Sequence, residues 1–273
     1  MRTLLIILFF PFVVFTQRQN NLSKSEIGIF SGASYYIGDL NTLEHFKNSQ
    51  VAIGIIVKYN INPRVALRGL FMTGSVSADD ATSPSRYQGV YTNRNLSFSS
   101  TITEIGAGIE FNYFPFQLGN KTYRGSGYLF AEVAYFQMNP STTYLGETVE
   151  LRTLGTEGQG TPLNTNDYYS KNQLAIPFGI GFKYPFGKIF CFGMEYGIRK
   201  TFTDYLDDVS SDRFVDKAQL MEVASPLTVA LSNRNINGSA YGPRGNSQTK
   251  DWYFIYGITF TIRLGNPDEC FKH

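Results

Sequence analysis

The fold is decided by the segment WYFIYGITFTIRL, residues Trp252–Leu264. Every second residue is apolar or aromatic, and the intervening residues are mostly small or polar. The apolar row consists of Trp252, Phe254, Tyr256, Ile258, Phe260, Ile262 and Leu264. Because successive side chains of a β-strand point to opposite faces, this pattern predicts a strand with one apolar face. Lipid-facing barrel strands need about 9–11 tilted residues, so this strand is long enough to cross a membrane.

The composition limits the classes of protein to which the chain can belong. Of its 273 residues, 15% are aromatic and only 17% are charged, which is below the usual value of about a quarter. The formal net charge is +2, and no run of basic residues occurs. Because nucleic-acid binding requires a clustered basic patch, we expect no nucleic-acid partner.

The N-terminus has the pattern of a secretory signal. Arg2 gives a positive start, and Leu4–Phe15 is an apolar core. Small residues precede a cleavage site expected just before Gln17, which makes residues 1–16 a signal peptide. The alternative is an uncleaved anchor helix, but a spanning helix needs about 20 apolar residues. Residues 17–25 would then be a short periplasmic lead, and the exported chain would be secreted, periplasmic or in an outer membrane.

Seven further segments repeat the alternation and are predicted to be strands. They are Ile27–Ile37, Val51–Tyr59, Val65–Met72, Thr101–Tyr113, Tyr128–Tyr135, Leu174–Tyr184 and Phe190–Arg199. Proline lacks a backbone donor, so Pro177 predicts a local bulge or break. Short turns follow the second, fourth and sixth strands, whereas long polar loops follow the third, fifth and seventh. The long loops are Ser75–Ser97, Met138–Lys171 and Asp204–Lys250.

This order predicts an all-β protein, an eight-stranded antiparallel transmembrane β-barrel of the bacterial outer membrane. The barrel would comprise residues 26–264, with three long external loops and a periplasmic tail at 265–273, and outer-membrane lipid would surround it. The alternatives are a soluble eight-stranded barrel such as a lipocalin, or a secreted sandwich. Both would turn the apolar row inward and need a charged exterior, whereas the opposite row here combines glycines with charges of both signs.

Charged residues in the inward rows predict an ion-pair network inside the barrel. They are Lys58, Arg68, Glu104, Glu110, Glu132, Lys183, Glu195, Arg199 and Arg263. Side chains fill the interior of a barrel of eight strands, and buried charges are costly unless paired. The favoured interpretation is a structural plug of salt bridges. A conduction path or a catalytic carboxylate pair is the alternative.

Catalytic and cofactor sites have little support in the sequence. A hydrolase needs a nucleophile or an activated water beside a base, usually histidine. His45 lies in the first external loop and His273 is the last residue, so neither belongs to an inward row. We expect no enzyme activity, no cofactor and no small-molecule substrate.

A cluster of aspartates follows the seventh strand. Its members are Asp204, Asp207, Asp208, Asp212 and Asp216. Oxygen ligands at such spacing can hold calcium, but no calcium-loop signature is matched. An acidic external loop is therefore the favoured interpretation, and we expect no metal site.

Within the same loop, the apolar spacing of Arg213–Ala224 predicts a short helix over the external mouth or on the barrel rim, or an amphipathic stretch that docks a partner.

The chain has two cysteines, Cys191 and Cys270. An exported location permits a disulfide. Cys191 begins the seventh strand at the periplasmic end, and Cys270 lies in the tail beyond the eighth. Either a bridge holds the tail under the barrel mouth, or the two thiols are separate.

Three blocks of sequence resemble PorG-like outer-membrane barrel proteins of the type IX secretion system. The first is Ser34–Asn41 (SYYIGDLN), the second is Thr203–Ser210 (TDYLDDVS), and the third is Arg244–Asn246 leading into Asp251–Phe254 (DWYF). The resemblance implies an outer-membrane barrel whose periplasmic side contacts a ring of PorK- and PorN-like proteins. It also implies a part in protein transport and, in some bacteria, in gliding motility. The resemblance carries over no catalytic residues.

Two functions from different classes follow. The first is a structural anchor whose periplasmic contacts include Asn62, Pro63, Pro185 and Gly187 in the short turns. The second is a surface-binding module, in which the long external loops bind a ligand or a host surface. A narrow channel is a third, less favoured interpretation.

Overall fold

The computed structural model describes residues 24–82, 93–120, 122, 125–235 and 243–264. Its centre is a closed barrel of eight long antiparallel strands, so the predicted fold class is confirmed. The strands are β1 (Ser25–Ile37), β2 (Gln50–Asn60), β3 (Val65–Asp79), β4 (Ser97–Asn112), β5 (Ser126–Tyr144), β7 (Asn172–Phe186), β8 (Phe190–Thr201) and β9 (Trp252–Arg263). A short strand, β6 (Glu147–Glu150), pairs with the external end of β5.

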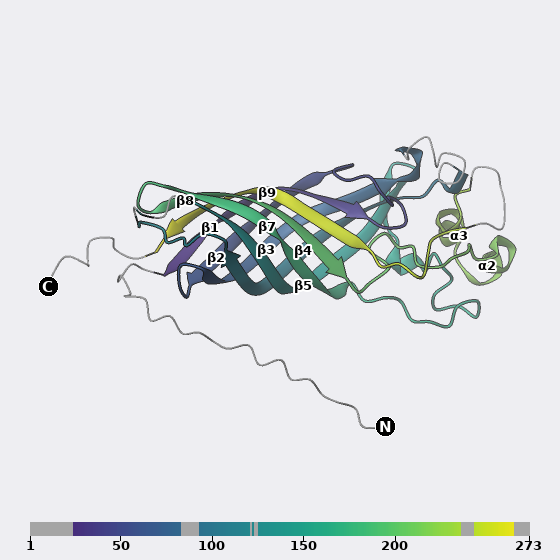
Figure 1. Cartoon of the computed structure of the whole chain (residues 1–273). Coiled ribbons are helices and arrows are strands. Elements are labelled where there is room, and N and C mark those ends of the chain that lie inside the picture. Colours follow the sequence, from purple (N-terminus) through teal and green to yellow (C-terminus); the bar gives the residue numbers. More distant parts are fainter. Residues whose placement is uncertain (1–23, 83–92, 121, 123–124, 236–242, 265–273) are drawn as a thin grey trace, which may run out of the picture.

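The wall closes because each of the eight strands pairs with a neighbour on both sides. Sequential strands pair as hairpins, β5 pairs with β7, and β1 pairs with β9 from Glu26 to Ile37. Closure satisfies the backbone groups within the sheet, as lipid requires. Figure 1 shows short turns at the end where β1 begins and β9 ends, and long connections gathered at the other end. We call these the periplasmic and the external end.

Side chains of the wall alternate between lipid-facing and interior positions. On β9, Ile258 and Phe260 are exposed on the outside, whereas Thr259, Thr261 and Arg263 are buried inside. The other strands extend the same apolar belt around the barrel. It includes Val51, Ile53, Ile55 and Val57 of β2, Ile105 and Ile109 of β4, Leu129 and Val133 of β5, Ile180 and Phe182 of β7, and Phe192 and Met194 of β8. A continuous outer apolar belt rules out the soluble barrel, whose apolar row would face inward.

Among the described residues, no helix has both the length and the apolar character to span a membrane.

Three strands extend further at the external end than predicted. Residues 73–79, 97–100 and 136–144 lie outside the predicted strands yet belong to β3, β4 and β5. Inward residues there are buried and mostly apolar, as Val76 and Met138 are, but outward residues such as Ser77 and Asn139 are polar. The outward apolar row ends where the strand leaves the lipid, although the strand itself continues into water. For this reason the segments resembled loops.

Two local predictions have different outcomes. The ladder between β5 and β7 is interrupted at Pro177 and resumes in the same register, so the predicted break is present.

The helix predicted over Arg213–Ala224 is shorter, because Asp216 caps α2 (Lys217–Val223). A second helix, α3 (Pro226–Ser232), was not predicted. Its proline occupies the first turn, where a missing backbone amide costs no hydrogen bond.

The interior has two zones along the barrel. Most of the predicted charged residues are buried toward the periplasmic half, whereas an apolar core fills most of the external half, where Glu104 and Arg199 also lie. This core includes Ile56, Leu70, Met72, Ile102, Phe136, Met138, Leu206, Val209 and Phe214. The sequence did not reveal the apolar zone, because residues from the external loops complete it only in the folded chain.

Replacing Ile258 by arginine tests the position of the belt. A cation at the bilayer midplane costs a transmembrane barrel about 2–4 kcal/mol, and about 0–1 kcal/mol near the interfaces. We expect Ile258→Arg to lower the free energy of unfolding in lipid vesicles by the larger amount, measured by urea titration. Thr101→Arg, on the outward face of β4 beyond the belt, is the matched control. Equal losses in the two variants would contradict the assigned belt.

Candidate functional site

Arg68 of β3 is the centre of the charged zone inside the barrel. Its guanidinium binds Glu195 of β8 through two hydrogen bonds of 3.0 and 3.1 Å. It also lies 3.7 Å from Glu110 of β4 and pairs with Glu132 of β5. The Tyr128 hydroxyl donates a further hydrogen bond of 2.6 Å to Glu195. One arginine therefore connects carboxylates from three strands, the arrangement that makes buried charges tolerable.

The network continues from Glu110 to two lysines, and a second arginine forms a separate ion pair inside the barrel. The ammonium groups of Lys58 and Lys183 lie 2.7 and 2.5 Å from the Glu110 carboxylate. Arg199 pairs with Glu104 at 3.5 Å. The described ion pairs of the interior thus involve eight of the nine residues singled out in the sequence, six of them in one network and two in the separate pair. Their side chains fill the interior at this level.

Two interior residues differ from the sequence prediction. Arg263 is buried, but it donates to the backbone carbonyl of Leu118 at 2.9 Å and takes part in none of the described ion pairs. Glu26 was missed because the first strand was predicted to start at Ile27, two residues after its start at Ser25. It is buried inside and accepts hydrogen bonds from Asn60 at 2.6 Å and Thr261 at 2.9 Å. Its place in the inward alternation of the first strand was the available signal.

The periplasmic mouth is closed by the turn between β4 and β5. Phe116 and Leu118 of this turn are buried, where they pack with Cys191. The Lys183 ammonium lies 4.5 Å from the centre of the Phe116 ring, and Arg263 anchors the turn through its bond to Leu118. The turn therefore acts as a plug rather than as an extended connection.

The residues predicted to contact a periplasmic partner lie at the tips of the other two turns. Asn62 accepts hydrogen bonds from two backbone amides of its own turn, at 2.8 and 2.9 Å. Gly187 has a φ of 71°, which favours glycine. Pro63 and Pro185 are half-buried beside them. Their contact with a partner stays a prediction.

Several predictions concern residues outside the described ranges. Cys191 is buried near the periplasmic mouth, but Cys270 lies outside the described residues, so the disulfide stays a prediction. The same holds for the signal peptide at 1–16, the tail at 265–273 and His273.

A folded cap closes the external end, which we define as residues 38–41, 80–82, 93–96, 151–169, 203–234 and 243–251. Two buried arginines organise it. Arg94 binds both carboxylate oxygens of Asp80, at 2.7 and 2.8 Å, and the backbone carbonyl of Asp39 at 2.9 Å. Arg244 binds Glu157 at 3.1 Å. The cap is thus held by buried polar contacts between loops that are distant in sequence.

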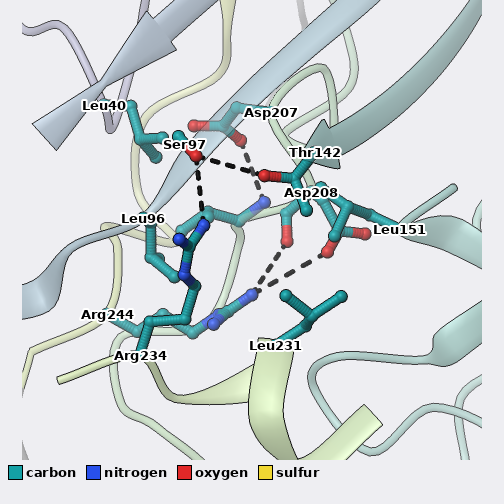
Figure 2. Close-up of a pocket in the computed structure, with 11 residues that line it drawn as sticks. Leu40, Leu96, Ser97, Thr142, Leu151, Asp207, Asp208, Leu231, Arg234 and Arg244 are labelled. Carbon is teal, nitrogen blue, oxygen red and sulfur yellow. Dashed lines mark hydrogen bonds and ion pairs between the residues drawn. The ribbon is translucent and has the colours of Figure 1, made fainter. Parts of the chain in front are cut away.

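Figure 2 shows a small cavity inside this cap, beside Arg244. Its empty space is about 270 Å³, part of which is open to solvent. It is lined by Leu40, Leu96, Ser97, Thr142, Leu151, Asp207, Asp208, Val209, Leu231, Arg234 and Arg244. Arg234 donates to the Ser97 hydroxyl at 3.1 Å, and Arg244 donates to the backbone carbonyl of Asp208 at 3.2 Å. Because the protein already engages these polar groups, we assign no ligand to the cavity.

Tyr36 of β1 connects the cap to the barrel. Its hydroxyl lies 2.5 Å from Asp207 and 2.9 Å from Asp251, and both carboxyl groups are buried. A hydroxyl donates a single proton, so holding both contacts requires a proton on one carboxyl group. Burial, followed by the negative charge of Asp251, raises the pKa of Asp207 well above its usual range. Burial likewise raises the pKa of Asp251.

The aspartate cluster lies in the external connection after β8, as predicted, but most of it is buried. Asp204, Asp207 and Asp208 are buried in the cap. Asp212 lies at the surface, and Asp216 accepts two backbone hydrogen bonds at the start of α2. Within the described ranges, no group of three or more His, Cys, Asp or Glu side chains has a geometry that could hold a metal ion. The burial of these aspartates requires tertiary contacts that a local pattern does not contain.

The three sequence blocks that resemble PorG-like proteins meet in the cap. The first block supplies Tyr36 and Asp39, the second supplies Asp207, and the third supplies Asn246 and Asp251. Besides the contacts of Tyr36, the Asn246 amide donates to Asp39 at 3.1 Å. The blocks therefore share one structural task, which is to seal the external end.

A closed eight-stranded sheet with an apolar outer belt, a charge-filled interior and long external connections defines an outer-membrane β-barrel. The protein is accordingly a component of the bacterial outer membrane. The chain belongs to the family described as Domain of unknown function (DUF6089), which it matches over residues 2–222. No curated protein matches the chain.

Several solved outer-membrane proteins are similar in structure. Neisserial surface protein A (NspA) is 10% identical, with a TM-score of 0.43, over 90% of this chain and 100% of that protein. Ail of Yersinia pestis is 11% identical, with a TM-score of 0.40, over 89% and 99% of the two chains. OprG from Pseudomonas aeruginosa is 10% identical, with a TM-score of 0.40, over 90% and 98%. The assignment to this class rests on the geometry of the barrel itself.

Removing the Arg68 charge should destabilise the barrel. Breaking a buried ion pair by deleting one partner costs about 3–5 kcal/mol, because the remaining charges lose their counterion. We expect Arg68→Met to lower the free energy of unfolding in vesicles by that amount, measured by urea titration. Arg68→Met with Glu132→Gln should recover part of the loss, and Lys188→Met, at an exposed turn residue, should have little effect. A loss no larger than that of Lys188→Met would contradict the central role of Arg68.

The cap should loosen as pH rises. Burial raises the pKa of Asp39 to about 6, and burial also raises that of Asp208 to about 6. A carboxyl with a raised folded pKa stabilises the folded state below its unfolded pKa of about 4, by about 3 kcal/mol for a shift of this size. That stability is lost as pH rises through about 6. Hydrogen exchange of the cap amides, corrected for intrinsic rates, should show less protection at pH 7 than at pH 4.

Asp39→Asn and Asp208→Asn are the control variants for this effect. Each asparagine stays neutral at every pH, so each variant should reduce the pH dependence of cap protection. Protection that rises from pH 4 to pH 7 in the unmodified protein would contradict the assignment.

Proposed function

We propose that this protein is a non-catalytic outer-membrane anchor of a type IX protein secretion machinery. The observation that supports this most is closure of the barrel at three levels. The Phe116 turn closes the periplasmic mouth, the ion pairs of Arg68 fill the interior, and the cap covers the external end. A barrel filled in this way has no bore for folded cargo. Its contribution to secretion would be attachment and position rather than passage.

The type IX assignment comes from the resemblance of the three sequence blocks to PorG-like proteins. The blocks lie far apart in the chain, yet Tyr36, Asp207 and Asp251 bring all three into direct contact. A common structural task supports treating the blocks as one feature rather than as three coincidental similarities. The partners would then be periplasmic ring proteins of the PorK and PorN type.

The periplasmic turns offer a surface for such a partner. Ile61 and Phe186 are exposed apolar residues at the tips of two turns. Arg64 and Lys188 are exposed cations next to them. Apolar anchors with a charged rim are typical of protein interfaces, and exposed cations favour a partner with acidic groups. We assign the ring contact to the turns at 61–64 and 185–188, which include Asn62, Pro63, Pro185 and Gly187.

A second candidate function is binding of a ligand or a host surface by the external loops. It is favoured by apolar side chains exposed on the external side. Leu145 at the β5–β6 tip is 88% exposed, and Met221 of α2 is 66% exposed. Shortening the β5–β6 hairpin would distinguish the candidates, because only surface binding should be lost while secretion continues.

Charge reversal at the turn tips tests the anchor. Arg64→Glu combined with Lys188→Glu should leave the barrel folded and reduce co-purification of the periplasmic ring proteins. A loss of about 1.4 kcal/mol in interface energy corresponds to about a tenfold weaker association, and we expect an effect of at least this size. Met221→Glu on the external side is the matched control and should co-purify normally. Unchanged co-purification by a folded double variant would count against the anchor.

A further inference from the structure

The first external loop, residues 42–49, folds back along the outer wall of the barrel. Tyr35 of β1 points outward, as Ile27 and Ile29 do, yet it is 0% exposed. His45 and Phe46 cover it, with ring centroids 5.8 and 5.2 Å from that of Tyr35. An external loop thus lies on a face of the sheet that elsewhere contacts lipid.

The loop is held there by an aromatic cluster on β1, β8 and β9. The Phe46 ring lies 5.1 Å from Tyr256 and 6.1 Å from Tyr196. The Tyr35 hydroxyl is 2.9 Å from Nδ1 of His45 and 2.7 Å from the Tyr196 hydroxyl. Three polar atoms of the cluster are therefore bonded to each other, which makes its outer surface better suited to an apolar environment.

The depth of this cluster follows from strand geometry. A strand rises about 3.3 Å per residue, and a tilt of about 40° reduces the rise to about 2.5 Å along the barrel axis. Tyr256 lies eight residues from Leu264, the last residue of the apolar row at the periplasmic end. This separation corresponds to about 20 Å along the axis. The apolar band of such barrels is about 25 Å tall. Phe46, which packs on Tyr256, is thus within the upper part of the band.

The outer side of the loop continues the belt. Leu43 is 55% exposed and Phe46 is 53% exposed. Ile258 and Met194, which pair with each other one step below Tyr256 and Tyr196, are exposed belt residues. Nearer the external end, the Lys200 ammonium lies 5.8 Å from the centre of the Trp252 ring. Tryptophan and lysine are typical of the headgroup level, so the belt and the loop reach the membrane surface together.

We propose that Leu43, His45 and Phe46 form a lipid-docking patch that inserts the first external loop into the outer leaflet. The partner is the boundary between acyl chains and headgroups. The patch fixes the depth of the barrel on the side of β1, β8 and β9, and it does not depend on what the periplasmic turns bind. Two outcomes compete with this proposal. Either a second copy of the chain covers the patch, or the loop is held above the membrane and surrounded by water.

The only tryptophan of the chain is Trp252, so a fluorescent reporter can be moved to the patch. Phe46→Trp in a Trp252→Phe background is reconstituted in vesicles of phospholipid with brominated acyl chains, which quench on contact. We expect blue-shifted emission, loss of most of the intensity in brominated vesicles, and little quenching by aqueous acrylamide. Met221→Trp in the same background is the matched control, because it is exposed on α2 and should show the reverse.

Leu43→Trp is a second reporter if Phe46→Trp does not fold, which heat-dependent electrophoretic mobility of the barrel reveals. Emission and quenching like those of Met221→Trp would overturn the proposal. Protection from both quenchers that is lost when excess lipid dilutes the protein would overturn the proposal as well. Such a loss would show that a second copy of the chain, and not lipid, covers the patch.

Discussion

Every part of this protein depends on the closure of its sheet in lipid. Hydrocarbon offers no hydrogen-bond partner, so backbone groups of the wall must pair within the protein. The pairing of β1 with β9 completes the ring. Once the ring is closed, the side chains of each strand point alternately to the lipid and to the barrel interior. The outward row must be apolar, and the charges of the inward row must be paired or neutralised within the protein.

The interior and the cap satisfy this second requirement in different ways. In the described interior, the five buried acids Glu26, Glu104, Glu110, Glu132 and Glu195 face the five buried bases Lys58, Arg68, Lys183, Arg199 and Arg263. In the cap, the seven buried acids Asp39, Asp80, Glu157, Asp204, Asp207, Asp208 and Asp251 face two buried arginines, Arg94 and Arg244. Opposite charges therefore neutralise the interior, whereas the cap depends in part on protons that its carboxyl groups retain.

Closure also explains where the molecule can interact. The Phe116 turn, the ion pairs and the cap occupy the inside, so the outer wall, the periplasmic turn tips and the external surface are the parts available to partners. The first external loop illustrates the principle, since it adds its apolar side chains to the wall. In the proposed anchor role, such a barrel would hold a position in the membrane without passing cargo.

The pattern of residues along the chain was enough to predict the membrane barrel, its eight wall strands, the outward belt and the identity of most interior charges. These features follow from a period of two residues and from the lengths of the connections, which are local properties of the chain. Glu26 escaped only because a strand end is the least certain part of such a pattern. Tertiary structure alone decided which carboxylates meet Arg68, how Phe116 closes a mouth and why Asp207 is buried. Each of these depends on the register around the closed ring or on contacts between loops far apart in sequence, and no local pattern encodes either.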